Sequence, residues 1–177
     1  MVAAAGEVGS GTTHAARGEY FSTLSPMGGG VSKDEALPEM ERLADCHAVE
    51  CLGRQPGTAT GEHSAAWADA EVDAAARAAL EADEHAVVVV HVVAGSKTGM
   101  CTPSESVAEG LVADYGAERV VCVLDACQVR HGEALMPRWL AAYGCSLVTS
   151  SKFFAGPSFG GAVLLSDDFA ERIEADL

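Results

Sequence analysis

The sequence predicts an α/β protein with a three-layer α/β/α arrangement, built on a mainly parallel sheet with one added antiparallel strand. Two observations support this fold class. Apolar strand-like runs alternate with helical patterns from residue 65 onward, and the first run, 86–94, is apolar on both faces, as in a strand that helices cover on both sides. The order strand, helix, strand, helix, strand is typical of parallel sheets with right-handed crossovers.

The elements follow one another in the order that such a fold requires. An alanine-rich helix is expected at 65–83, where Trp67, Val72, Ala76 and Leu80 lie at helical spacing. It is followed by strands and helices in turn, at 86–94, 103–117, 119–125, 134–144, 145–150, 161–166 and 167–177. Only about ten residues without a helix join the last two strands, too few for a parallel crossover, so the final strand is expected to run antiparallel.

The N-terminal third of the chain shows little periodicity. Residues 1–63 are rich in Gly, Ser, Thr and Ala, and we expect an irregular segment that belongs to the same domain as residues 64–177. A chain of 177 residues is long enough for one domain with a substantial core.

Composition narrows the classes of partner. The formal net charge is −15, and an acidic surface repels phosphate backbones, so no nucleic-acid partner is expected. The longest apolar run, "AVVVVHVVAG", is too short to span a bilayer, and the N-terminus lacks the basic and apolar regions of a signal peptide. We therefore expect a cytoplasmic protein without a membrane partner.

The six cysteines form no CxxC pair. Cys122 and Cys145 lie inside apolar runs and are expected to be buried thiols in a reducing compartment. Cys46, His47 and Cys51 are a conceivable metal-ligand set, but no second pair follows at the spacing of a zinc finger. We expect no metal site.

Polar residues follow three of the predicted strands at the point where each strand ends. These stretches are "AGSKTG" at 94–99, "LDACQ" at 124–128 and "TSSKFF" at 149–154. Because ligands in parallel α/β sheets bind at the carboxyl ends of the strands, we expect the three stretches to converge on one crevice.

Two chemistries suit such a crevice. The first is a nucleotide-phosphate site, since "GSKTG" superficially resembles a Walker A loop. That pattern needs glycines six positions and one position before the lysine, and His91 and Ser96 stand there instead. The backbone cannot then wrap a phosphate, which disfavours a nucleotide-binding domain.

The second chemistry is that of pyridoxal 5'-phosphate. This cofactor requires a lysine that binds it covalently, a carboxylate that keeps its pyridine nitrogen protonated, a donor to the ring hydroxyl, and hydroxyl groups near the phosphate. Asp125 ends the second strand, Lys152 follows the third, and Gln128 lies three residues after Asp125. The hydroxyl residues that directly precede the lysine are Thr149, Ser150 and Ser151.

"LDACQ" followed by "TSSKFFAGPSFGGAVLL" resembles the large domain of fold-type I pyridoxal-phosphate enzymes, and is most similar to the class V aminotransferase and cysteine desulfurase branch. The resemblance covers about residues 86–177. It implies an internal aldimine at Lys152, a pyridine-nitrogen contact from Asp125, and proton transfer at the substrate by the released lysine. It also implies cofactor contacts from Gln128, Thr149, Ser150, Ser151, Ser96 (at an asparagine position of the family) and His91.

The resemblance implies a transferase or lyase that acts on a small amino-acid substrate and forms a homodimer in the complete protein. The sequence ends soon after the lysine loop, so we expect the C-terminal small domain to be absent, together with its arginine for the substrate carboxylate. The chain is then a partial or diverged member. The alternative is a catalytically inactive remnant of the large domain that acts as a binding or interaction module.

The N-terminal motif "GEVGSGTTHAA" has two interpretations. In one, Ser10, Gly11 and Thr12 form the phosphate cradle at the start of the first large-domain helix. In the other, "GEVGSG" corresponds to the family's next strand end, the cradle precedes this sequence, and Val8 replaces the histidine that stacks on the cofactor ring.

Overall fold

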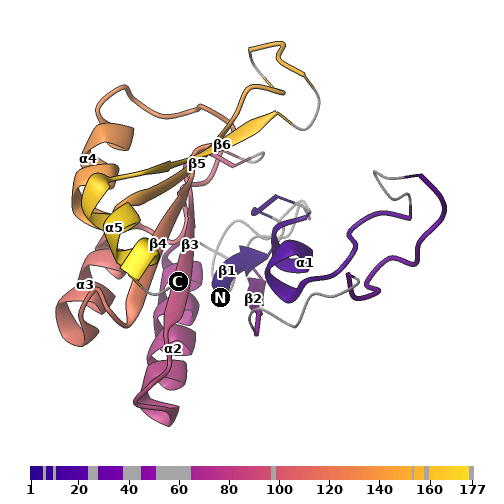
Figure 1. Cartoon of the computed structure of the whole chain (residues 1–177). Helices are drawn as coiled ribbons and strands as arrows, with labels where there is room; N and C mark the ends of the chain where they lie inside the picture. Colours follow the sequence, from indigo (N-terminus) through magenta and orange to yellow (C-terminus); the bar gives the residue numbers. More distant parts are fainter. Residues whose placement is uncertain are drawn as a thin grey trace.

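One six-stranded sheet organises the protein (Figure 1). The computed structural model describes residues 1–5, 7–9, 11–23, 28–37, 45–50, 65–96, 99–152, 154–157 and 160–175. The strand order is β2-β1-β3-β4-β5-β6. The strands are β1 Val2–Ala5, β2 His47–Glu50, β3 Val88–Val93, β4 Val120–Asp125, β5 Cys145–Thr149 and β6 Gly161–Leu165.

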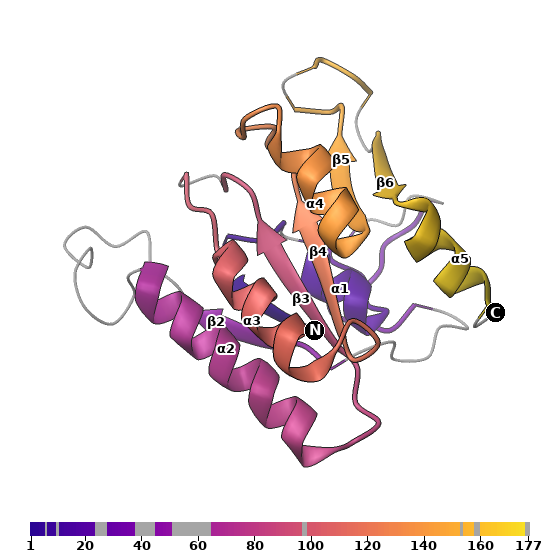
Figure 2. The same cartoon turned by 90° about the vertical axis from the view of Figure 1, so that its left-hand side faces the viewer.

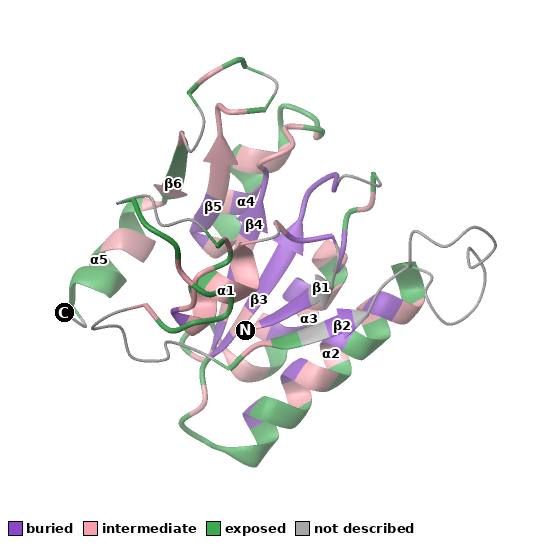
Figure 3. Ribbon diagram, turned by 90° about the vertical axis from the view of Figure 1, so that its right-hand side faces the viewer, coloured by how far each residue is buried: buried purple, intermediate pink, exposed green. Residues whose placement is uncertain are grey.

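Helices pack mainly on one face of this sheet. The helices are α1 Thr12–Arg17, α2 Ala65–Ala82, α3 Glu105–Tyr115, α4 Leu135–Tyr143 and α5 Asp167–Ala175. Helices α2, α3 and α4 lie side by side over one face (Figure 2), whereas α1 lies against the other (Figure 3). The protein is therefore α/β, but on the second face the described residues contribute only the six-residue α1 rather than a full layer of helices.

The predicted strand directions are confirmed. Strands β1 to β5 run parallel, and β6 runs antiparallel to β5 with Thr149 opposite Gly161 and Cys145 opposite Leu165. The short connection after β5 contains no described helix, which is why the chain returns antiparallel to its neighbour.

The prediction of an irregular N-terminal segment is wrong for residues 2–5, 12–17 and 47–50. Strand β1 lies inside the sheet between β2 and β3, and Ala3 is buried. Alanine has a low β-propensity, so the sequence of this four-residue strand gave little indication of a strand. Within the N-terminal segment, β1 and β2 thus belong to the same sheet as the later strands.

Alternate side chains of β3 and β4 point to opposite faces of the sheet. Helix α2 buries Ala68, Val72, Ala76 and Leu80 at intervals of four residues, and Trp67 is partly buried beside them. These helical residues pack in one core with Val90 and Val92 of β3 and with Cys122 and Leu124 of β4. The alternate residues of the same strands, including His91 and Asp125, therefore point to the face opposite α2, α3 and α4.

The sheet is least covered at β6. Val163 and Leu165 of this edge strand are 59 % and 39 % exposed, and Figure 3 shows the change from buried β3 to exposed β6 across this face. Within the described part of the chain, no helix is long and apolar enough to cross a membrane.

Candidate functional site

Strands β3, β4 and β5 end at one edge of the sheet. Val93 pairs with Asp125, and Asp125 pairs with Leu147, so the last residues of β3 and β4 lie level with the middle of β5. Lys152 follows β5 by three residues. The parallel arrangement thus brings the segments after the three strands to the same edge of the sheet, as the sequence predicted.

A buried, hydrogen-bonded pair of a histidine and an aspartate lies at this edge. His91 Nε2 lies 3.2 Å from Asp125 Oδ2, and the residues are only 3 % and 8 % exposed. The register explains the contact, because His91 pairs with Val123 and Asp125 is two residues further along β4. Diagonal neighbours on one face of a sheet are within reach of long side chains. The second carboxylate oxygen, Oδ1, accepts the backbone N–H of Cys127 at 3.0 Å.

The environment keeps the Asp125 carboxyl ionised. Burial alone raises its pKa, because the charged form loses water, but hydrogen bonds from His91 and from the Cys127 N–H outweigh that penalty. The resulting pKa is about 2. Since a carboxylate oxygen accepts more than one hydrogen bond, Asp125 retains acceptor capacity for a further donor.

Cys127 lies in the turn after β4, two residues from Asp125. Burial and the Asp125 carboxylate raise the pKa of the Cys127 thiol to about 12, whereas the Lys152 charge acts in the opposite direction. Lys152 itself is exposed, three residues after the end of β5. Sequence reasoning did not single out Cys127, although a backbone N–H two residues after an aspartate is the usual partner in an Asx turn.

The turn after β3 is closed by its own hydrogen bonds. Ser96 is fully buried, its Oγ accepts the Met100 N–H at 3.1 Å, and its own N–H donates to the Met100 carbonyl at 2.8 Å. Arg130 donates to the Ser96 carbonyl at 2.9 Å and lies against Gly95, where an added Cβ would be 2.7 Å from the Arg130 Cβ. Ser96 thus shapes the turn through both its backbone and its hydroxyl group.

The hydroxyl residues that precede Lys152 make contacts within the loop that follows β5. Thr149 Oγ1 donates to the Gly160 carbonyl and lies 2.8 Å from Ser151 Oγ. Ser150 accepts the Gly156 N–H on its carbonyl, and a Cβ added at Gly156 would lie 2.3 Å from Ser150 Oγ. These contacts bring Thr149 and Ser150 against Gly156 and Gly160, where a larger residue would not fit.

For several other predicted site residues, the structure gives a position and a degree of burial but no specific contact with the site. Gln128 is half-buried in the turn directly after β4, and Val8 is buried against Val93. Strand β1 ends at Ala5 and α1 begins at Thr12, so the motif between them contains both a strand end and a helix start. Neither interpretation of that motif is thereby selected. Ser10, Lys97 and Cys51, which the sequence analysis considered, lie outside the described residues.

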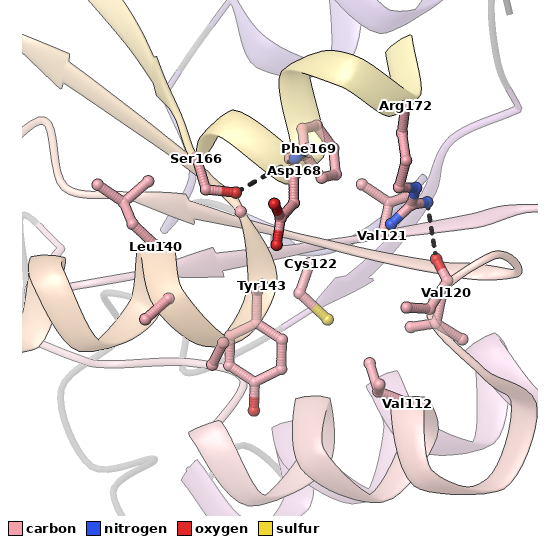
Figure 4. A pocket seen from close by; sticks show the side chains of 14 residues that line it. Val112, Val120, Val121, Cys122, Leu140, Tyr143, Ser166, Asp168, Phe169 and Arg172 are labelled. Carbon is pink, nitrogen blue, oxygen red and sulfur yellow. Dashed lines mark hydrogen bonds between the residues drawn. The ribbon is translucent and has the colours of Figure 1, made fainter. Parts of the chain in front are cut away.

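A pocket of about 140 Å³ lies at the opposite end of the strands (Figure 4). Its wall includes Val120, where β4 begins, and Gly144, which precedes β5, together with Tyr143, Phe169 and Arg172 from helices α4 and α5. Arg172 donates to the Ala117 carbonyl at 3.0 Å. This pocket is separated from Asp125 by the length of β4 and contributes nothing to the site.

The described residues fit one end of pyridoxal phosphate better than the other. The buried, ionised Asp125 fits the requirement of a protonated pyridine nitrogen, and Lys152 follows β5, the strand that pairs with β4. A phosphate needs several converging donors, but the hydroxyls of Thr149, Ser151 and Ser96 are engaged in local turns. Among the described residues, groups that would suit the ring of such a cofactor are present, and a converging set of donors for its phosphate is not.

No protein-family model and no curated protein matches this sequence. Any functional conclusion therefore depends on the residues and geometry of the site.

Proposed function

We propose that the chain is the large-domain portion of a pyridoxal-phosphate-dependent transferase or lyase that acts on an amino acid. The observation that carries the proposal is the buried, ionised Asp125 at the end of β4, beside the parallel strand that leads to Lys152. A deeply buried carboxylate costs free energy because it loses water, and its occurrence at a strand end is typical of a functional site.

Each residue has a role that follows from its position. Asp125 would accept a hydrogen bond from the protonated ring nitrogen, and Lys152 Nζ would hold the cofactor and later accept and return a proton. Gln128, in the turn after β4, would donate to the ring oxygen. When bound, pyridoxal phosphate supplies an electron sink that stabilises negative charge on the substrate carbon.

The described residues around Lys152 do not supply enough hydrogen-bond donors for the cofactor phosphate. With the nearby hydroxyls engaged, the donors to a phosphate would come from residues outside the described ones or from a second copy of the chain. Charge-assisted hydrogen bonds contribute about 1.5–3 kcal/mol each, so two missing donors weaken binding by roughly two to four powers of ten. We therefore expect weak cofactor binding and feeble turnover from these 177 residues alone.

A catalytically inactive remnant that acts as an interaction module is the second candidate. Two observations favour it: Lys152 is exposed, and the exposed apolar side chains of β6 leave an edge strand open to another chain. The two candidates differ in what happens when an amino acid is added to the cofactor-loaded protein.

A spectral titration distinguishes them. The purified chain is titrated with pyridoxal phosphate, and a panel of amino acids is then added, with Lys152→Ala as the variant and Lys33→Ala as the matched control. An enzyme gives a cofactor absorbance band that depends on Lys152 and changes with at least one amino acid. A band that no amino acid changes supports the remnant, and a band retained in Lys152→Ala contradicts the proposed site.

A further inference from the structure

We propose that His91 is a positioning residue that fixes the Asp125 carboxylate through a donated Nε2–H hydrogen bond, and that it does not contact the cofactor itself. The importance of this contact for catalysis rests on the proposed function, in which Asp125 is the residue that would face the ring nitrogen. The contact itself is a property of the ligand-free protein and can be tested without any cofactor.

The direction of the hydrogen bond follows from the charge of Asp125. An ionised carboxylate has no hydrogen to donate, so the imidazole nitrogen 3.2 Å from Oδ2 must carry one. In neutral imidazole this places the hydrogen on Nε2 and leaves Nδ1 as an acceptor. The pair thus selects one tautomer of His91.

Two elements hold the carboxylate from different sides. His91, on β3, contacts Oδ2, and the Cys127 N–H, in the turn after β4, donates to Oδ1. A carboxylate held at both oxygens cannot rotate freely about its Cβ–Cγ bond. Its remaining lone pairs then keep a fixed direction, which is what recognition of a ring N–H requires.

Burial assigns His91 to this supporting role. The residue is 3 % exposed in the middle of β3, two residues before the strand ends, whereas Asp125 is the last residue of β4. A ligand at the carboxyl edge of the sheet meets Asp125 first and has His91 behind it. The expectation from sequence that His91 binds the cofactor is therefore replaced by an indirect role.

Removal of the His91 donor should raise the pKa of the Asp125 carboxyl. In His91→Phe the carboxylate stays buried and keeps only the Cys127 N–H, so its pKa should rise by about 2 units, to a midpoint near pH 4 or above. In His91→Gln, the side-chain amide offers a donor at about the position of Nε2, and the Asp125 carboxyl should stay ionised down to about pH 3.5.

The experiment is a carboxyl ¹³C NMR titration of the ligand-free chain from pH 7 to 3.5, with Asp125→Asn to assign the resonance. The expected result is titration of Asp125 in His91→Phe and none in the wild type or His91→Gln. If Asp125 stays ionised in His91→Phe, or titrates equally in both variants, the donor role is wrong. Imidazole ¹⁵N NMR of the wild type tests the same contact without a variant, because an Nε2 that carries no hydrogen at pH 7 would also overturn it.

A second measurement separates this inference from the proposed function. With ¹⁵N-labelled pyridoxal phosphate, the ring nitrogen should be protonated in the wild type and in His91→Gln and less protonated in His91→Phe. A wild-type chain that binds no cofactor would remove the proposed function and leave the ligand-free titration as the test of His91. Equal ring protonation in all three proteins would show that His91 does not act on the cofactor through Asp125.

Discussion

The buried Asp125 carboxylate makes a specific contribution to stability that depends on pH. Its pKa is lowered from 3.8 to about 2 in the folded protein. A group whose folded pKa is depressed stabilises the fold above its unfolded pKa and loses that contribution as the pH falls through the folded value. The window is therefore between about pH 5 and pH 2.

The magnitude follows from the two pKa values. At pH 5 both states are largely ionised, and a difference of nearly two units corresponds to about 2 kcal/mol, since one unit is about 1.4 kcal/mol. At pH 2.5 much of the folded-state advantage has gone, and the contribution falls below about 1 kcal/mol. The side chain of Asp125 is only 11 % exposed, so solvent screening takes little from this figure.

The assay compares the unfolding free energies of the wild type and Asp125→Asn. Many other carboxyl groups titrate in the same pH range, and their contributions cancel in the difference between the two proteins. Urea unfolding is followed by the fluorescence of the two tryptophans, of which Trp139 is 1 % exposed and donates to the Cys145 carbonyl. The wild-type advantage in unfolding free energy should shrink by more than about 1 kcal/mol between pH 5 and pH 2.5. A difference that stays constant with pH would refute the assignment of a depressed pKa to Asp125.

Two further predictions concern the packing and the thiols. Gly144→Ala places a Cβ 2.5 Å from the Phe169 Cβ at a φ of 83°, whereas Gly99→Ala has a φ of 87° and open space. Urea unfolding should show a loss of about 1–2 kcal/mol for Gly99→Ala and roughly 1–3 kcal/mol more for Gly144→Ala, and equal losses would show that the Phe169 contact costs nothing. Cys127, whose pKa is about 12, should react with iodoacetamide at pH 8 at least tenfold more slowly than the exposed Cys101, as peptide mass spectrometry would show. Comparable rates for the two thiols would contradict the burial and the carboxylate contact described for Cys127.

Much of the fold could be predicted because the central strands are strongly patterned. The runs that became β3 and β4 are apolar on both faces, and the short link after β5 dictates the antiparallel β6. Strands β1 and β2 have only four residues each, and the alanines of β1 indicate a helix as readily as a strand. Their place in the sheet depends on long-range pairing that no local pattern encodes.

The site could be predicted as a set of strand ends but not as a set of contacts. The pairing of Asp125 with His91 needs the register of β3 against β4, which a sequence pattern leaves open. Ser96 and Thr149 have the expected polar side chains, but the structure engages both in local turns. Side chains of Ser and Thr bind nearby backbone groups readily, so position at a strand end alone does not separate a ligand contact from a turn contact.

The central claim is that Lys152 is the residue to which pyridoxal phosphate attaches. The most direct measurement is borohydride reduction of the chain in the presence of the cofactor, followed by peptide mass spectrometry over all three lysines, Lys33, Lys97 and Lys152. The expected result is a reduced cofactor adduct on Lys152, retained in Lys33→Ala and lost in Lys152→Ala. An adduct on Lys33 or Lys97 with Lys152 unmodified, or no adduct at any lysine at saturating cofactor, would contradict the account.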